Sequence, residues 1–202
     1  MKKSIYLFIA GLFLISFSVQ AQKFEITPQY GYQVGAKYHY YGGYVKMTDS
    51  DQYGITVNME ISPDVEAEFF WAQQNASIRT EDYQYFPIEV HITDIQANHF
   101  QLGAIHSFGY GDAKPFAGAS LGWTSFNPDD SSYSSNTKFT IGISGGLRYY
   151  FSKRLGFRLQ GQLLMPIQWG SIYIGPGGGA VSTGGSLLQL NFTGGLIFGL
   201  GK

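Results

Sequence analysis

The alternation in the last stretch of the chain, residues 187–200, constrains the fold more than any other feature. Apolar residues there fall on one parity and polar or glycine residues on the other, the period of two that a β-strand with two different faces produces. The apolar set is Leu188, Leu190, Phe192, Leu196, Phe198 and Leu200, and the opposite set is Gln189, Asn191, Thr193, Gly195 and Gly199. Because this strand is long and runs almost to the last residue, we expect it to pair with the first strand, which closes the sheet and leaves no bare edge.

Seven earlier segments alternate in the same way, and they are residues 24–35, 52–61, 65–72, 99–108, 115–124, 139–151 and 155–167. Short turns alternate with long polar or aromatic connections, and the long ones are residues 37–50, 77–94, 127–137 and 169–186. An antiparallel meander places all long connections at one rim and all short ones at the other. The pattern therefore predicts an all-β fold, an eight-stranded antiparallel up-and-down barrel.

The polar parity indicates which face of the barrel is outside. A soluble barrel would carry many Lys and Glu residues on its outer face, whereas here the polar parity is mainly Gly, Gln, Thr, Ser and Asn, and charged residues make up only 13% of the chain. The apolar parity carries almost no charge, and one Lys or Arg on a lipid-facing surface costs about 2–4 kcal/mol at the bilayer midplane. The apolar face is therefore predicted to contact lipid, which makes this a transmembrane β-barrel.

Aromatic residues gather at two heights of this predicted barrel, as in the girdles at membrane surfaces. Those near the long connections are Tyr53, Trp71, Trp123 and Trp169, and those near the short turns are Phe24, Phe108, Tyr149, Phe151, Phe157 and Phe198.

The first 21 residues predict a secretory signal peptide. Lys2 and Lys3 precede an apolar run at residues 5–17, and we expect cleavage after Ala21, which leaves residues 22–202 as the barrel domain. In that domain 11 Lys and Arg residues stand against 14 Asp and Glu residues, a net charge of −3, so no basic face for nucleic acid is expected. The chain has no cysteine, which excludes a disulfide framework and a lipid anchor on cysteine.

Together, the signal peptide, the eight two-faced strands and the ending Gly-Leu-Ile-Phe-Gly-Leu-Gly-Lys resemble the outer membrane β-barrel protein family, the porin-like proteins common in Bacteroidota and related in shape to OmpA-type barrels. The resemblance implies a location in the outer membrane of a Gram-negative bacterium, in contact with outer-membrane lipid. It also implies insertion by the outer-membrane assembly machinery, which reads the last strand. The usual final aromatic residue is displaced here to Phe198.

Six charged residues fall on the interior parity, and they are Glu25, Glu60, Glu66, Glu68, Arg148 and Arg158. The interior of an eight-stranded barrel is just wide enough for its own side chains, so charges there must be paired or hydrated. We expect a salt-bridged plug in which Glu66 or Glu68 reaches an arginine across the lumen. The alternative is a narrow or gated conductance path in which these charges select ions.

Tyrosines crowd the first two long connections, and they are Tyr38, Tyr40, Tyr41, Tyr44, Tyr83 and Tyr85. Exposed aromatic clusters can stack on sugars or anchor a protein partner. They can equally belong to strands that rise past the bilayer and pack against one another, and the sequence leaves both interpretations open.

Signals for catalysis are weak. The pattern G-x-S-x-G occurs around Ser120 and Ser144, but a nucleophile elbow needs a strand-to-helix turn, and both matches lie within alternating strands. His106 and Ser107 would suit a lipid-modifying enzyme, yet neighbouring side chains of a strand point to opposite faces. The four histidines lack the supporting carboxylates of a metal site, and no cofactor is expected.

These observations predict a non-enzymatic integral outer-membrane barrel with a structural or surface-interaction role through its extracellular loops and an unidentified ligand or protein partner. One alternative is a small passive porin-like channel for ions or small solutes. The other is an outer-membrane lipid-modifying enzyme.

Overall fold

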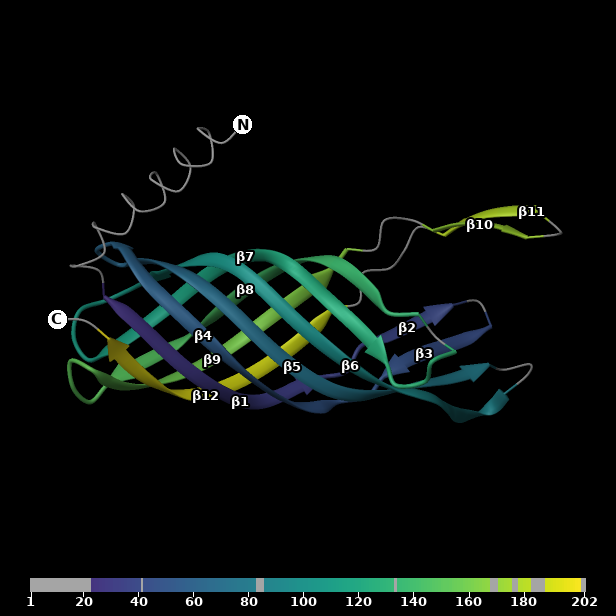
Figure 1. The fold of residues 1–202 in the computed structure, drawn as a ribbon, viewed down its shortest axis with the longest axis horizontal. Coiled ribbons are helices and arrows are strands. Elements are labelled where there is room, and N and C mark those ends of the chain that lie inside the picture. The colour runs from purple at the N-terminus through teal and green to yellow at the C-terminus, as the bar shows by residue number, and fades with distance from the viewer. Residues whose placement is uncertain are drawn as a thin grey trace, which may run out of the picture.

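A computed structural model describes residues 23–40, 42–82, 86–132, 134–167, 171–175, 178–182 and 188–200. The expected signal peptide and the residues Trp169, Tyr41, Tyr83 and Tyr85 lie outside these ranges. Eight strands form a closed antiparallel ring in the order β1, β4, β5, β6, β7, β8, β9, β12 (Figure 1). Their bounds are β1 Phe24–Val34, β4 Ser50–Ser62, β5 Val65–Asp82, β6 Phe86–Ser107, β7 Ala113–Pro128, β8 Asn136–Tyr150, β9 Leu155–Pro166 and β12 Gln189–Leu200. The eight-stranded barrel expected from the sequence is confirmed.

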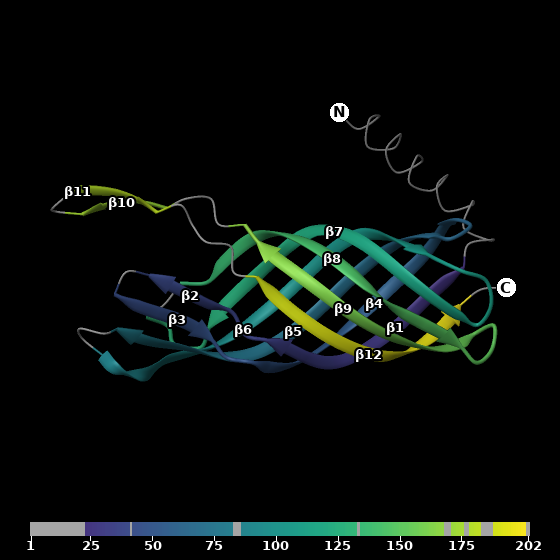
Figure 2. The same cartoon turned by 180° about the vertical axis from the view of Figure 1, so that it is seen from behind.

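The first and last strands of the ring lie side by side (Figure 2). β1 pairs antiparallel with β12, from Phe24 opposite Leu200 to Val34 opposite Leu190. Each of the eight strands has a neighbour on both sides within the ring, because β5 and β6 also pair with each other. The predicted pairing of the last strand with the first is therefore confirmed.

At the rim of the long connections, the ends of β5 and β6 extend beyond the ring and two further strands lie beside them (Figure 1). The hairpin of β2 (Lys37–Tyr40) and β3 (Gly43–Met47) pairs through β3 with the end of β5, from Ile78 to Asp82. The end of β5 also pairs with the beginning of β6. The result is a four-stranded sheet in the order β2, β3, β5, β6, which we call the protruding sheet.

Large parts of the first two long connections, residues 37–50 and 77–94, are therefore strands that extend beyond the ring, which is one of the two interpretations that the sequence left open. Beyond the membrane a sheet can meet water on both faces, so its strands need no regular alternation of apolar and polar residues. The fourth connection also contains a short hairpin, β10 (Ser171–Gly175) paired with β11 (Gly178–Ser182).

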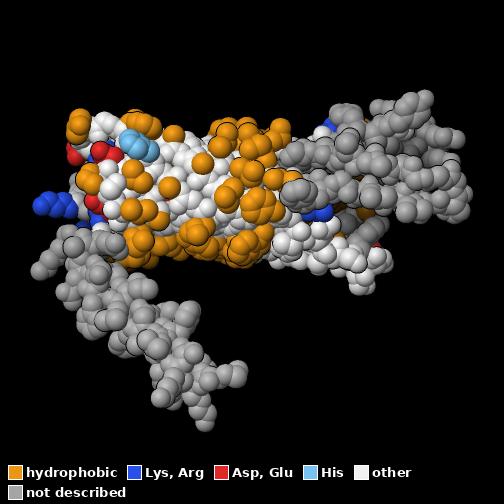
Figure 3. Space-filling model, turned by 90° about the horizontal axis from the view of Figure 1, so that it is seen from above, with side chains coloured by type: hydrophobic (Ala, Val, Ile, Leu, Met, Phe, Trp, Pro, Cys, Tyr) orange, Lys and Arg blue, Asp and Glu red, His pale blue; other side chains and the backbone are white. Residues whose placement is uncertain are grey.

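The polar parity faces the lumen and the apolar parity faces outward. Gln52 and Gln74 are completely buried, whereas Tyr30 and Leu102 are more than 60% exposed. Figure 3 shows hydrophobic side chains along the flank of the barrel, while the charged side chains visible on that face lie near its ends. This distribution suits a barrel that is surrounded by lipid along its middle.

Aromatic side chains pack in pairs at both rims of the apolar surface. Tyr53 lies edge-on to Trp71 beside the long connections, with ring centroids 6.3 Å apart. Tyr149 and Phe151 form a similar pair beside the short turns, at 5.4 Å. Such rings favour the boundary between hydrocarbon and headgroups, so the pairs mark the two membrane surfaces.

The lumen also holds apolar side chains among the polar ones. Five of them are almost completely buried, and they are Phe70, Ile105, Phe116, Leu164 and Ile197. They fill space between the polar groups, so the interior is a mixed core. Within the described residues, the fold contains no helix that is long and apolar enough to span a membrane.

Candidate functional site

Arg148 on β8 is the centre of a layer of charged residues inside the barrel, which we call the charge layer. Its Nη1 and Nη2 donate to the two carboxylate oxygens of Glu66, each over 2.7 Å. Nη1 also lies 3.3 Å from Glu25 Oε2, and Nη2 donates to Ser107 Oγ. Because the Arg148 side chain is 1% exposed, its charge is removed from water and depends on these partners.

Arg158 on β9 lies directly opposite Arg148 in the β8–β9 ladder. Its Nη2 donates to Glu68 Oε2 over 2.7 Å, its Nη1 to Asn58 Oδ1 over 3.2 Å and its Nε to Gln160 Oε1 over 2.8 Å. Like charges opposite each other in a ladder repel, so the carboxylates are what allow two arginines to share this position.

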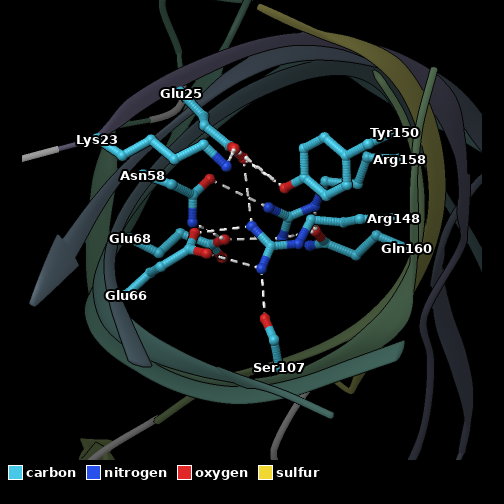
Figure 4. Close-up of polar contacts among 10 residues, drawn as sticks. All are labelled: Lys23, Glu25, Asn58, Glu66, Glu68, Ser107, Arg148, Tyr150, Arg158 and Gln160. Atoms are coloured by element: carbon cyan, nitrogen blue, oxygen red, sulfur yellow. Dashed lines mark hydrogen bonds and ion pairs between the residues drawn. The ribbon is translucent and has the colours of Figure 1, made fainter. Parts of the chain in front are cut away.

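Aromatic rings complete the charge layer. The Tyr150 hydroxyl donates to the Glu25 carboxylate, at 2.9 Å from Oε2, and Lys23 Nζ lies 2.6 Å from Glu25 Oε1. The Phe116 ring faces the Arg158 guanidinium, with 4.4 Å from Cζ to the ring centroid, the geometry of a cation–π contact. Figure 4 shows that these polar side chains converge from several walls of the barrel toward its centre.

The sequence pattern did not single out three residues that belong to this layer, and they are Tyr150, Phe116 and Asn58. Tyr150 has the same parity as Arg148, and Asn58 has the same parity as Gln52 and Thr56, so parity alone could have identified both. Phe116 is harder to recognise, because an aromatic residue on a polar parity is ambiguous until its neighbours across the lumen are known.

Glu60 does not belong to the charge layer. It lies opposite Glu66 in the β4–β5 ladder and so keeps the lumen-facing parity. It is exposed, however, because it lies near the end of β4, where water reaches its carboxylate. The other five charged residues expected inside lie together: Glu66 pairs with Arg148, Glu68 pairs with Arg158, and Glu25 lies next to Arg148.

The protruding sheet has its own polar cluster around Tyr44 on β3. The Tyr44 hydroxyl lies 2.8 Å from Glu81 Oε2 and 2.9 Å from Glu89 Oε2, and Lys37 Nζ lies 3.3 Å from the centroid of its ring. Arg79 Nη1 donates to Glu89 Oε1 over 3.2 Å. Since these residues come from β2, β3, β5 and β6, the cluster ties the four strands together.

These contacts shift two acid–base equilibria outside the membrane. The hydrogen bonds to Glu81 and Glu89 raise the pKa of Tyr44 well above its ordinary value, because they favour the protonated phenol. The hydrogen bonds from Tyr44 and Arg79 lower the pKa of Glu89, because they favour the carboxylate.

Of the loop tyrosines singled out by sequence, Tyr44 is thus buried within the protruding sheet. Tyr38 and Tyr40 belong to β2. Tyr41, Tyr83 and Tyr85 lie outside the described residues.

One edge of the protruding sheet carries unpaired backbone. Among the described residues, β6 pairs with β7 only from Ile95 onward, so its earlier part has β5 on one side alone. Ile88 and Val90 in this part are 78% and 40% exposed. An open strand edge with exposed apolar side chains can pair with another extended chain.

The residues considered for catalysis are not brought together. His106 is exposed and its ring lies 4.7 Å from that of Phe108, whereas Ser107 is buried and contacts Arg148. Ser120 and Ser144 both lie within strands. Across the described part of the chain, no group of three or more His, Cys, Asp or Glu residues could hold a metal ion.

A closed ring of strands, a lipid-facing outer surface and a lumen filled with paired charges define an integral outer-membrane β-barrel. The model of the outer membrane protein beta-barrel domain matches residues 9–165, and the chain therefore belongs to this family. The protein is accordingly located in the outer membrane. No curated protein sequence matches the chain.

Several solved barrels are similar in fold. The outer membrane protein OprG from Pseudomonas aeruginosa superposes with a TM-score of 0.64 at 13% identity, over 91% of this chain and 98% of OprG. Neisserial surface protein A gives 0.60 at 15% identity, over 87% and 96% of the two chains. Ail of Yersinia pestis, solved with the heparin analogue sucrose octasulfate, gives 0.52 at 12% identity, over 89% and 99%. At these identities the similarity extends to the fold alone.

Proposed function

We propose that this protein is a non-enzymatic outer-membrane scaffold that presents the protruding sheet to a protein partner outside the cell. The observation that carries the proposal is the open edge of β6 around Ile88 and Val90. Extended segments add to such edges through backbone hydrogen bonds, and side chains at alternate positions supply specificity. The partner that fits is therefore an extended segment with apolar residues at alternate positions.

The charge of the protruding sheet favours a peptide over a sulfated glycan. Ail was solved with a heparin analogue, and recognition of a polyanion needs clustered basic residues. Here Glu81, Glu89 and Asp94 lie at or near the β6 edge, against Arg79 and His91. Lys37, Lys46, Arg79 and His91 are neighbours in one row across the sheet, but Glu81 and Glu89 lie close to them, so the surface is mixed in charge, which disfavours a polyanion.

The binding experiment uses the folded protein in lipid nanodiscs and a library of short synthetic peptides with apolar residues at alternate positions. Selected peptides should protect from hydrogen exchange those backbone amides of residues 88–93 that point away from β5, because these donors become paired. The double substitution Ile88→Lys with Val90→Lys should abolish this protection, since charges on an edge oppose strand addition. Ser134→Lys, at an exposed position between β7 and β8, is the matched control. Protection elsewhere, or none with any peptide, would contradict the proposal.

The charge layer supports a scaffold over a channel, because Arg148, Arg158 and their partners meet across the lumen (Figure 4). We expect planar-bilayer recordings of the folded protein to show no conductance steps. Regular steps would favour the passive channel instead. The lipid-modifying enzyme is tested separately: lipid acylation should be unchanged in a deletion strain.

A further inference from the structure

Four side-chain amides gather inside the barrel toward the long-connection rim, and we call them the amide cluster. They are Gln33 on β1, Gln52 on β4, and Gln189 and Asn191 on β12. Gln33 lies opposite Asn191 in the β1–β12 ladder, and Gln52 pairs with Gly31 on the other side of β1. All four side chains are completely buried.

Most polar atoms of the amide cluster have no hydrogen-bond partner among the described protein atoms. This holds for both amide atoms of Gln33 and of Gln52, for Gln189 Oε1 and for Asn191 Oδ1. The remaining contacts are long, with Gln189 Nε2 at 3.9 Å from Met47 Sδ and Asn191 Nδ2 at 3.5 Å from Gln162 Oε1. Buried amides are almost always bonded to protein or to ordered water, so this concentration calls for an additional partner.

We infer that ordered water molecules bind in the amide cluster and bridge its side chains. The partner must donate to amide oxygens and also accept from amide nitrogens, because both kinds of atom are unpaired here. It must be small, because an eight-stranded barrel leaves little space inside. The cluster itself carries no charge to balance that of an ion. Water meets all of these requirements and occupies such sites in protein interiors.

Met47 covers the amide cluster on the side of the protruding sheet. Its side chain is 5% exposed and packs with Ala76 and Ile95 in an apolar group. Its Sδ faces Nε2 of Gln74 at 3.8 Å and Nε2 of Gln189 at 3.9 Å. The apolar group therefore lies directly against the amides and separates them from the outside.

Backbone hydrogen bonds hold this cover in place. Met47 N donates to Ala36 O over 2.8 Å, just beyond the end of β1, and Thr48 N donates to Ser77 O on β5 over 2.9 Å. The base of the β2–β3 hairpin is thus fastened to two strands of the ring. The bound water should consequently exchange slowly with bulk water.

Nuclear magnetic resonance of the folded protein in nanodiscs tests the inference. Side-chain amide hydrogens of Gln33 and Gln52 should show cross-relaxation with long-lived bound water, and Met47→Ala should speed exchange of these amides on the order of tenfold. Met59→Ala removes the same side chain from the lipid-facing parity of β4 and should leave the exchange unchanged. Absence of water cross-peaks in the unmodified protein would overturn the inference.

A second variant keeps the test decisive if Met47→Ala does not fold. Gln52→Leu removes one amide while it preserves a side chain of similar length on β4. If water bridges the cluster, the water cross-peaks of Gln33 should weaken or disappear. Unchanged Gln33 cross-peaks would show that the two amides do not share bound water and would overturn the bridging arrangement.

Discussion

Arg158 and Glu68 are joined across the full width of the barrel, with Nη2 of the arginine 2.7 Å from Oε2 of the glutamate. Their strands, β9 and β5, are opposite each other in the ring, separated by β4, β1 and β12 on one side and by β6, β7 and β8 on the other. Both side chains are buried. One ion pair therefore holds two opposite walls at a fixed distance.

Replacing Arg158 with alanine should destabilise the barrel strongly. Loss of one partner leaves the Glu68 carboxylate buried and unpaired, which costs about 3–5 kcal/mol. Urea unfolding from lipid vesicles, followed by the loss of heat-modifiable gel migration, measures the change. Adding Glu68→Gln to Arg158→Ala should recover part of the loss, because no charge then remains unpaired.

Arg154→Ala is the control for this experiment. Arg154 is an exposed arginine in the turn between β8 and β9, and its replacement should change the free energy of unfolding by no more than about 0.5 kcal/mol. Equal effects of the two substitutions would contradict the role assigned to the Arg158–Glu68 pair.

The positions of Glu60 and Glu66 predict different responses to the same substitution. Glu66→Gln breaks the two-pronged pair with Arg148 and should cost roughly 3 kcal/mol of unfolding free energy. Glu60→Gln, at an exposed position, should cost no more than about 0.5 kcal/mol. A large effect of Glu60→Gln in the same unfolding assay would show that this carboxylate is paired within the charge layer.

The protruding sheet should loosen at both acidic and alkaline pH. The pKa of Glu89 is lowered from 4.5, so its contribution to stability is present above that value and is lost as the pH falls through the lowered pKa. The pKa of Tyr44 is raised from 10.0, so its contribution is present below that value and is lost as the pH rises through the raised pKa. We therefore expect the sheet to be most rigid between about pH 5 and pH 10.

A spin label at Ile88→Cys measures this rigidity, because the chain has no other cysteine. Label mobility should increase on acidification of the otherwise unmodified protein. With Glu89→Gln the label should already be mobile at neutral pH and should respond less to acid. The same acid response with and without Glu89→Gln would show that another group controls the sheet.

Replacement by alanine should disturb folding at Gly122 but not at Gly161. A Cβ added to Gly122 on β7 would overlap the backbone carbonyl oxygen of Phe100 on β6, whereas a Cβ on Gly161 would meet nothing nearer than Phe192 Cε1 at 3.5 Å. Gly122→Ala should therefore prevent or distort the pairing of β6 with β7, and Gly161→Ala should fold normally. The folded fraction on a gel without boiling distinguishes them, and equal fractions would mean that the ladder can absorb the added methyl group.

The barrel could be predicted from the sequence because lipid and lumen impose opposite requirements on neighbouring residues. Gln52 and Tyr53, for example, are adjacent in sequence but face the lumen and the lipid respectively. The same parity rule indicates which residues point inward. It cannot determine which carboxylate meets Arg148 or Arg158, because that depends on how the strands are staggered around the ring.

What the sequence left wrong or open also has physical causes. Glu60 follows the interior parity and lies opposite Glu66, but parity does not show that its carboxylate is exposed near the end of β4. The protruding sheet lies beyond the lipid, where the alternation that identifies the other strands is not required. Its pairing depends on contacts between distant segments, such as Tyr44 with Glu81 and Glu89, which no local pattern encodes.

The seam between β1 and β12 has a consequence for the order of folding. Phe24 and Leu200 are neighbours across this seam, although in sequence they lie near the two ends of the barrel domain. Until the seam forms, two strand edges remain open, and unpaired backbone groups are very costly within hydrocarbon. Closure and insertion should therefore occur together, as one cooperative event. A chain that lacks β12 should fail to insert at all, instead of forming a smaller or slightly weaker barrel.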